Sequence, residues 1–173
     1  GLLTSLVWMN IHTNDLEGTI PTEVGLMTSL THLDIRGSNL IGTIPTEIGR
    51  LVLLKLLNVR VNTLEGTIPS ELGKLTSLSR LNLSNNILSG TIPTEVIVPS
   101  LEWLSLSYND FLSGPVPATE LAAVSNLTVL YLAENQVFGT IPSNLCSTLE
   151  EAKFDCGEIV CDCCANLTSG TSC

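Results

Sequence analysis

The side chains that most often carry out chemistry are scarce in this chain, and their spacing matches no catalytic arrangement. The two histidines, His12 and His32, have no serine, cysteine or pair of carboxylates placed as an activated nucleophile or an acid–base pair requires. The sequence also lacks a glycine-rich phosphate-binding loop. We therefore expect no catalytic, cofactor-binding or metal-binding residues, a protein that is not an enzyme, and histidines exposed on strands.

The cysteines predict a different kind of chemistry, since all six lie in the last 28 residues. An even number of cysteines crowded into one short segment predicts a local set of disulfide bonds and an oxidising compartment. Cys161-x-x-Cys164 also has the spacing of a zinc pair, but no second pair follows it and neither histidine is near. The sequence leaves the pairing open among the six predicted disulfide cysteines, Cys146, Cys156, Cys161, Cys163, Cys164 and Cys173.

Three Asn-x-Ser/Thr sequons, at Asn82, Asn126 and Asn166, are potential sites of N-linked glycans. Together with the cysteines they predict a secreted or extracellular protein. The net charge of −10, with only seven Lys and Arg, makes nucleic acid a poor partner. Every apolar run is interrupted too early to span a membrane, so no membrane span is expected in this chain.

A fixed period reveals the elements that must position these residues. Gly-Thr-Ile-Pro begins at residues 18, 42, 66, 90 and 139, and Gly-Pro-Val-Pro begins at 114. Upstream of each lies the frame L-x-x-L-x-L-x-x-N, as in residues 78–86, although Ser38 stands where repeat two should have its Asn. Each L-x-L alternation predicts a short strand with its apolar side chains inward, and stacked copies predict a parallel sheet.

This pattern resembles the plant-type leucine-rich-repeat family. The resemblance implies an α/β solenoid: a right-handed superhelix with a parallel concave β-sheet, irregular convex segments and a disulfide-rich C-terminal cap. We expect a repeat array over residues 1–145, with six 24-residue-type repeats starting in mid-repeat, and the cysteine-rich cap over 146–173. The resemblance implies that Cys146, which follows the last repeat, pairs downstream. The Gly-Thr-Ile-Pro-Thr-Glu motif and the Cys-Asp-Cys-Cys motif near the C-terminus resemble those of secreted repeat proteins of diatoms and other stramenopiles.

The outward positions of the predicted concave strands carry the candidate binding residues. Three of the seven cations lie there, together with most of the Trp and Tyr residues. Arginines and aromatic residues are typical of recognition surfaces, so we expect this face to bind a protein or a carbohydrate. The simpler interpretation is a variable surface, and a glycan on Asn82 would stand in the middle of the face. The predicted set is Trp8, His12, His32, Asp34, Arg36, Arg60, Arg80, Trp103, Tyr108 and Tyr131.

The opposite side repeats hydroxyl and acidic residues. Its Glu residues form an acidic row, and a threonine row runs through Thr19, Thr43, Thr67 and Thr91. β-Propensity on a solvated edge strand explains the threonines most simply. The row is also a candidate site for O-linked glycans or an ice-like lattice of hydroxyls.

From these observations we expect a non-enzymatic extracellular recognition or adhesion module that binds through its concave face. One alternative is a glycosylated building block of an extracellular coat or filament that assembles end to end. A further alternative is an inhibitor of a wall-degrading enzyme or an ice-binding protein. The array opens in mid-repeat with apolar residues, so we expect either further repeats before Gly1 or self-association at this uncapped edge.

Overall fold

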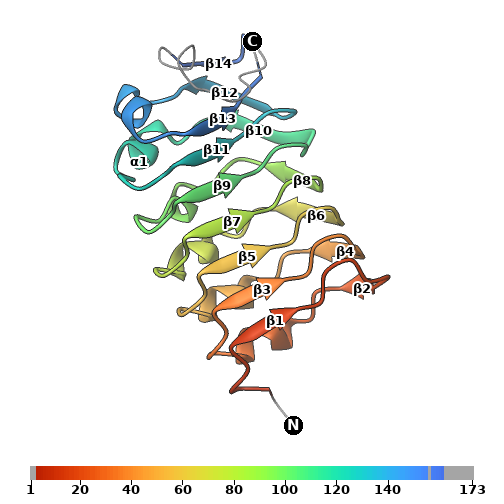
Figure 1. The fold of residues 1–173 in the computed structure, drawn as a ribbon. Coiled ribbons are helices and arrows are strands. Elements are labelled where there is room, and N and C mark those ends of the chain that lie inside the picture. The colour runs from red at the N-terminus through yellow and green to blue at the C-terminus, as the bar shows by residue number, and fades with distance from the viewer. Residues whose placement is uncertain (1–2, 156, 162–173) are drawn as a thin grey trace.

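The computed structural model describes residues 3–155 and 157–161, which form one elongated stack of coils (Figure 1). Each coil contributes one strand to each of two parallel sheets, here called sheet A and sheet B. Sheet A runs in the order β1 (Trp8–Asn10), β3 (His32–Asp34), β5 (Leu56–Asn58), β7 (Arg80–Asn82), β9 (Trp103–Ser105), β11 (Val129–Tyr131), β13 (Glu151–Lys153). Sheet B runs β2 (Glu17–Thr19), β4 (Asn39–Thr43), β6 (Thr63–Thr67), β8 (Ile87–Gly90), β10 (Phe111–Pro115), β12 (Gln136–Thr140), β14 (Ile159–Val160).

Sheet A is the parallel sheet that the Leu spacing predicts. Sheet B is more regular than the sequence indicates, because the edge strands expected at the threonines are hydrogen-bonded from coil to coil into a second parallel sheet. Short helices lie between each strand of sheet B and the next strand of sheet A. Among the described residues one is an α-helix, α1 (Ala118–Ala122), and the others are 3-10 helices: Thr22–Leu26, Thr46–Arg50, Ser70–Lys74, Thr94–Val96 and Ser143–Ser147.

The two sheets differ in register. In sheet A, residues at the same place in the repeat pair with one another, as Leu33 does with Leu57. In sheet B, Thr43 pairs with Glu65, so that Thr67, its counterpart in the repeat, lies two residues further along the neighbouring strand. Each strand of sheet B is therefore displaced by two residues relative to the repeat motif.

Leucines and asparagines hold the coils together. The inward leucines of sheet A, such as Leu57 and Leu81, are completely buried. Buried Asn86 accepts a hydrogen bond from the Leu64 N–H of the preceding coil (3.1 Å) and donates to the carbonyls of Val59 (3.1 Å) and Leu83 (3.0 Å). The motif asparagine thus satisfies backbone groups of two coils at once.

The 3-10 helices of successive coils pack closely through a glycine. A Cβ added to Gly49 would lie 2.5 Å from the carbonyl oxygen of Glu71 in the next coil. No larger residue fits at that contact. The same close approach recurs between Gly25 and Glu47 and between Gly73 and Glu95.

Both sheets continue past residue 145, because β13 pairs with β11 and β14 pairs with β12. The segment expected to be a cap therefore begins by extending the array. Cys146 and Cys161 are disulfide-bonded. The other predicted disulfide cysteines, Cys156, Cys163, Cys164 and Cys173, lie outside the described residues, as does the sequon residue Asn166.

At the first coil the core is only partly covered. Met9, Ile11 and Leu16 are half-buried and line an apolar groove of about 240 Å³. Along the described part of the chain, no helix combines the length and the hydrophobicity that crossing a membrane requires.

Candidate ligand-binding face

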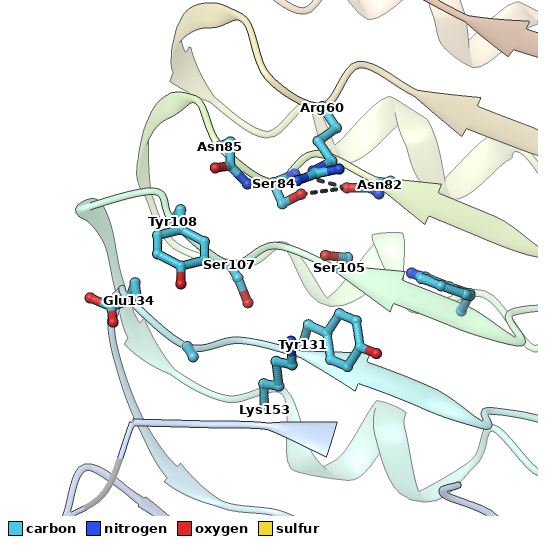
Figure 2. A pocket seen from close by; sticks show the side chains of 12 residues that line it. Arg60, Asn82, Ser84, Asn85, Ser105, Ser107, Tyr108, Tyr131, Glu134 and Lys153 are labelled. Carbon is cyan, nitrogen blue, oxygen red and sulfur yellow. Dashed lines mark hydrogen bonds between the residues drawn. The ribbon is translucent and has the colours of Figure 1, made fainter. Parts of the chain in front are cut away.

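Sheet A carries a hollow of about 490 Å³ on its outer face (Figure 2). Four of the predicted binding residues line it: Arg60, Trp103, Tyr108 and Tyr131. Strands β7, β9 and β11 provide its floor, and Lys153 of β13 closes one side. The structure thus brings together residues from five successive coils at one place.

The turn that follows each strand of sheet A builds another side of this hollow. Asn85, Tyr108 and Glu134 occupy the same place in three successive turns, and each has a positive φ, between 57° and 60°. Residues other than glycine adopt this left-handed conformation infrequently. It brings all three side chains to the rim of the hollow.

A smaller hollow of about 150 Å³ adjoins the first. Arg36 and Arg80 line it, and Asn82 and Trp103 line both hollows. The two hollows therefore form one recess, referred to below as the sheet A recess, which runs from Arg36 to Lys153. Its cations Arg36, Arg60, Arg80 and Lys153 are four of the seven in a chain whose net charge is −10.

Aromatic side chains and cations contact one another in the recess. The guanidinium carbon of Arg80 lies 5.8 Å from the ring centroid of Trp103, and the Trp103 and Tyr131 rings meet edge to face at 5.9 Å. The ammonium of Lys153 lies 5.0 Å from the Tyr131 ring. These cation–π and aromatic contacts hold the side chains in fixed orientations before any ligand arrives.

Tyr131 is also held through its hydroxyl, which donates a hydrogen bond to the Glu151 carboxylate. Burial, this hydrogen bond and the charge of Glu151 raise the pKa of Tyr131 to about 12. Tyr131 is therefore neutral at physiological pH.

A row of Asp and Asn side chains runs along sheet A beneath the exposed residues. In three successive coils the side-chain Oδ1 accepts a hydrogen bond from the backbone N–H two residues further along the chain. Asp34 accepts from Arg36 (3.3 Å), Asn58 from Arg60 (3.2 Å) and Asn82 from Ser84 (3.1 Å). Asp34 is 9% exposed, and its carboxylate also lies 3.6 Å from the Arg36 guanidinium. Of the predicted binding residues, Asp34 is therefore already engaged within the protein.

This row stops at β9, where Ser105 occupies the place of the Asp or Asn. The hydroxyl of Ser107, two residues on, is buried and has no hydrogen-bond partner among the described residues, and neither has the indole Nε1 of Trp103. The short side chains of Ser105, Ser107 and Ala133 form part of the lining of the large hollow.

Three predicted residues lie at the other end of sheet A and line neither hollow of the recess. Trp8 stacks on His32, with ring centroids 3.8 Å apart and an angle of 14° between the rings. Burial, followed by the charge of Lys55, lowers the pKa of His32 below its usual value. His12 Nδ1 lies 2.6 Å from the Thr13 hydroxyl. The predicted set therefore divides into a recess group and an end group.

The structure adds binding candidates that sequence reasoning missed. Lys153 and Glu151 belong to β13, which lies in the segment assigned to the cap. Ser107 is also absent from the predicted set. The signal that could have found it is the Ser at residue 105, where the row over Asn10, Asp34, Asn58 and Asn82 first breaks.

The predicted modification sites differ in exposure. Asn126 is exposed, whereas Asn82 is half-buried and lines both hollows of the recess. The threonine row of sheet B is exposed, and Thr43, Thr67 and Thr91 border a shallow groove of about 470 Å³. Within residues 3–155 and 157–161, His, Cys, Asp and Glu nowhere gather in a group of three that could bind a metal ion.

Comparison with known proteins identifies the repeat. A family model described as Leucine Rich Repeat matches residues 29–51, 77–97 and 126–148. No curated protein matches the chain.

Among solved structures, the chain is similar to the plant peptide hormone receptor RGFR1 in complex with RGF2, with 35% identity and a TM-score of 0.80 over 90% of this chain and 25% of that one. The BIR2 ectodomain from Arabidopsis thaliana is 31% identical, with a TM-score of 0.66 over 75% of this chain and 68% of that one. A plant ice-binding protein is 30% identical, with a TM-score of 0.72 over 90% of this chain and 49% of that one. The chain thus spans about a quarter of RGFR1.

Proposed function

Because the chain belongs to the leucine-rich-repeat family, we propose that it is an extracellular recognition module that binds a polypeptide ligand in the sheet A recess. The observation that carries this proposal is the recess itself, a continuous depression that crosses six coils. It gathers cations in an acidic protein, and its aromatic side chains are held by mutual contacts. Such a surface favours an extended ligand with negative charge.

The solved relatives support a protein ligand rather than a carbohydrate. RGFR1 is described as a peptide hormone receptor and was solved in complex with RGF2. The GASSHO1/SCHENGEN3 ectodomain from Arabidopsis thaliana, 35% identical, was solved with CASPARIAN STRIP INTEGRITY FACTOR 2. The names of these relatives also support an extracellular location, which fits the predicted sequons and disulfides.

The test is capture from a phage library of random nine-residue peptides by the purified protein. Enriched peptides should lose most of their affinity for the variant Arg36→Ala/Arg60→Ala/Trp103→Ala, because it removes cations from both hollows and the indole between them. Arg50→Ala/Lys74→Ala is the control for charge: it removes two cations that lie on 3-10 helices, away from the recess. Undiminished capture by the triple variant would rule out this face as the binding site.

Ice binding is a second candidate function, favoured by the similarity to the plant ice-binding protein. The exposed threonine row of sheet B would be the contact surface. Measurement of thermal hysteresis tests it, and a freezing point equal to the melting point would exclude it.

The coat or filament alternative rests on the partly covered first coil, where the apolar groove could pack against another copy. Sedimentation at increasing protein concentration tests this alternative. A monomer at all concentrations would exclude it.

A further inference from the structure

At the large hollow, the coil of β9 differs in one respect from the four coils that precede it: it offers hydrogen-bond donors and lacks the Asn or Asp acceptor that those coils supply. We propose that an acidic side chain of the polypeptide ligand binds there, and that its carboxylate takes the place of the missing Asn or Asp side chain. This inference rests on the proposed function, because it specifies the chemistry of one ligand residue in the same recess.

The preceding coil shows the arrangement that is missing. Asn82 Oδ1 accepts hydrogen bonds from both the backbone N–H of Ser84 (3.1 Å) and the hydroxyl of Ser84 (2.7 Å). One coil on, Ser107 stands in the place of Ser84 and presents the same two donors. Ser105 stands in the place of Asn82, and its shorter side chain carries no carboxamide oxygen to reach them.

Both donors of Ser107 therefore lack an acceptor. Its hydroxyl is a buried group with no partner, and no hydrogen bond from its backbone N–H is found within the described chain. Ser107 is only 5% exposed, yet it lines the hollow, and Figure 2 shows its hydroxyl directed toward the space beside Tyr131. Buried donors without acceptors are rare in folded proteins, so an acceptor supplied by a ligand would complete this site.

The charges around the floor favour an ionised acceptor over a neutral one. Two positive charges, Arg60 and Lys153, lie on opposite sides of the hollow in Figure 2. Glu134 at the rim is the negatively charged residue of the lining. A carboxylate offers two oxygens that only accept hydrogen bonds, which matches the two unpaired donors of Ser107. An amide would bring its own donors to the same place, and these would lack acceptors. The hollow should therefore discriminate Asp or Glu from Asn or Gln.

The test uses the peptides enriched from the random nine-residue library, resynthesised with each Asp or Glu replaced by its amide. At one position this replacement should weaken binding about ten-fold or more, since hydrogen bonds to charged groups are stronger than those between neutral groups. The protein variant is Ser105→Asn, which rebuilds the Asn82 arrangement over Ser107. It should weaken binding by a similar factor and raise the melting temperature, because both Ser107 donors then have an acceptor.

The losses of binding free energy from the peptide's amide replacement and from Ser105→Asn should not add, since both changes remove the same interaction. Asn10→Ser is the matched variant: it removes the same type of acceptor, which takes the His12 N–H, from a coil outside the recess, and it should leave the affinity for acidic peptides in place. Full affinity of Ser105→Asn for the acidic peptides, or enriched peptides without Asp or Glu, would overturn the inference while the proposed function stands. Tighter binding of oligogalacturonate than of any acidic peptide would overturn it in favour of an acidic sugar. If the library yields no binder at all, both proposals fail.

Discussion

The Cγ2 methyl of Thr43 packs against Gly66 of the next coil, at a place where a Cβ on that glycine would come within 3.0 Å of it. The arrangement recurs along sheet B: a Cβ added to Gly42 would come within 3.0 Å of the Thr19 methyl, and one added to Gly90 within 3.1 Å of the Thr67 methyl. The recurring Gly-Thr pair therefore has a packing function between coils. This accounts for the threonine row without a ligand, while O-linked glycans on the row stay a prediction.

Gly66→Ala should destabilise the protein by about 2–3 kcal/mol. The new Cβ would meet the Thr43 methyl, and the backbone at Gly66 has a φ of +76°, a conformation unfavourable for alanine. Chemical denaturation measures the change. Gly18→Ala is the matched control: its φ is +88° but no atom lies within 4 Å of the added Cβ, so only the backbone cost of about 1 kcal/mol applies. Equal losses of stability in the two glycine variants would contradict the packing argument. Adding Thr43→Ser to Gly66→Ala should restore part of the lost stability, because serine lacks the methyl that the new Cβ would meet.

Asn86→Ala should cost about 3 kcal/mol of stability, because the Leu64 N–H and two carbonyls in the interior lose their partner. Asn14→Ala is the control, since Asn14 has the same place in the first repeat but is exposed and bonds only to carbonyls of its own turn. Denaturant titration of the two variants should give clearly different midpoints. Similar midpoints would mean that the buried asparagines contribute little.

Ser38→Asn should stabilise the protein by about 1 kcal/mol. Ser38 is buried in the place of the motif asparagine, and its hydroxyl has no partner. An asparagine there can repeat the bonds of Asn62, which accepts the Leu40 N–H and donates to the Ile35 carbonyl. The melting temperature should rise for this variant and change little for Ser38→Ala. A lower melting temperature for Ser38→Asn would show that the site lacks room for the longer side chain.

Mild acid should destabilise the end of sheet A that contains His32. The folded state lowers the pKa of this histidine from 6.5, so the unfolded chain binds the proton more readily. The free energy of unfolding therefore decreases as the pH falls through and below 6.5, and this loss is absent at higher pH. His32→Phe keeps a ring against Trp8 but does not titrate, so the difference in stability between variant and wild type should grow between pH 7 and pH 5. A constant difference would contradict the prediction.

Sequence reasoning predicted sheet A well, because its signal is local and repeated. The frame around Leu33 and Leu57 placed the strands from β1 to β11 and their register correctly, including the strand at Trp103, where the repeat is one residue short. The recess group followed from the same register, since alternate residues of a strand share a face.

The features that the sequence did not reveal depend on contacts between coils. The two-residue displacement in sheet B cannot be read from a motif that repeats in step, since Thr43 and Thr67 look equivalent in sequence. Lys153 joins the recess because β13 extends sheet A into a segment whose cysteines suggested a separate cap. Asp34 looked like a ligand contact, but its carboxylate is engaged by the neighbouring Arg36 backbone and guanidinium, which only the three-dimensional arrangement reveals.

The displacement in sheet B also fixes the dimensions of any repeating partner on that side. Neighbouring strands lie about 4.8 Å apart, and two residues along a strand add about 6.6 Å, so equivalent threonines of successive coils are about 8 Å apart on an oblique line. A crystal surface or polymer that contacts the row must therefore present its groups at that longer interval. Sheet A, which is in step with the repeat, offers the shorter interval of one strand spacing. The two sheets of this chain thus present equivalent residues at two different intervals.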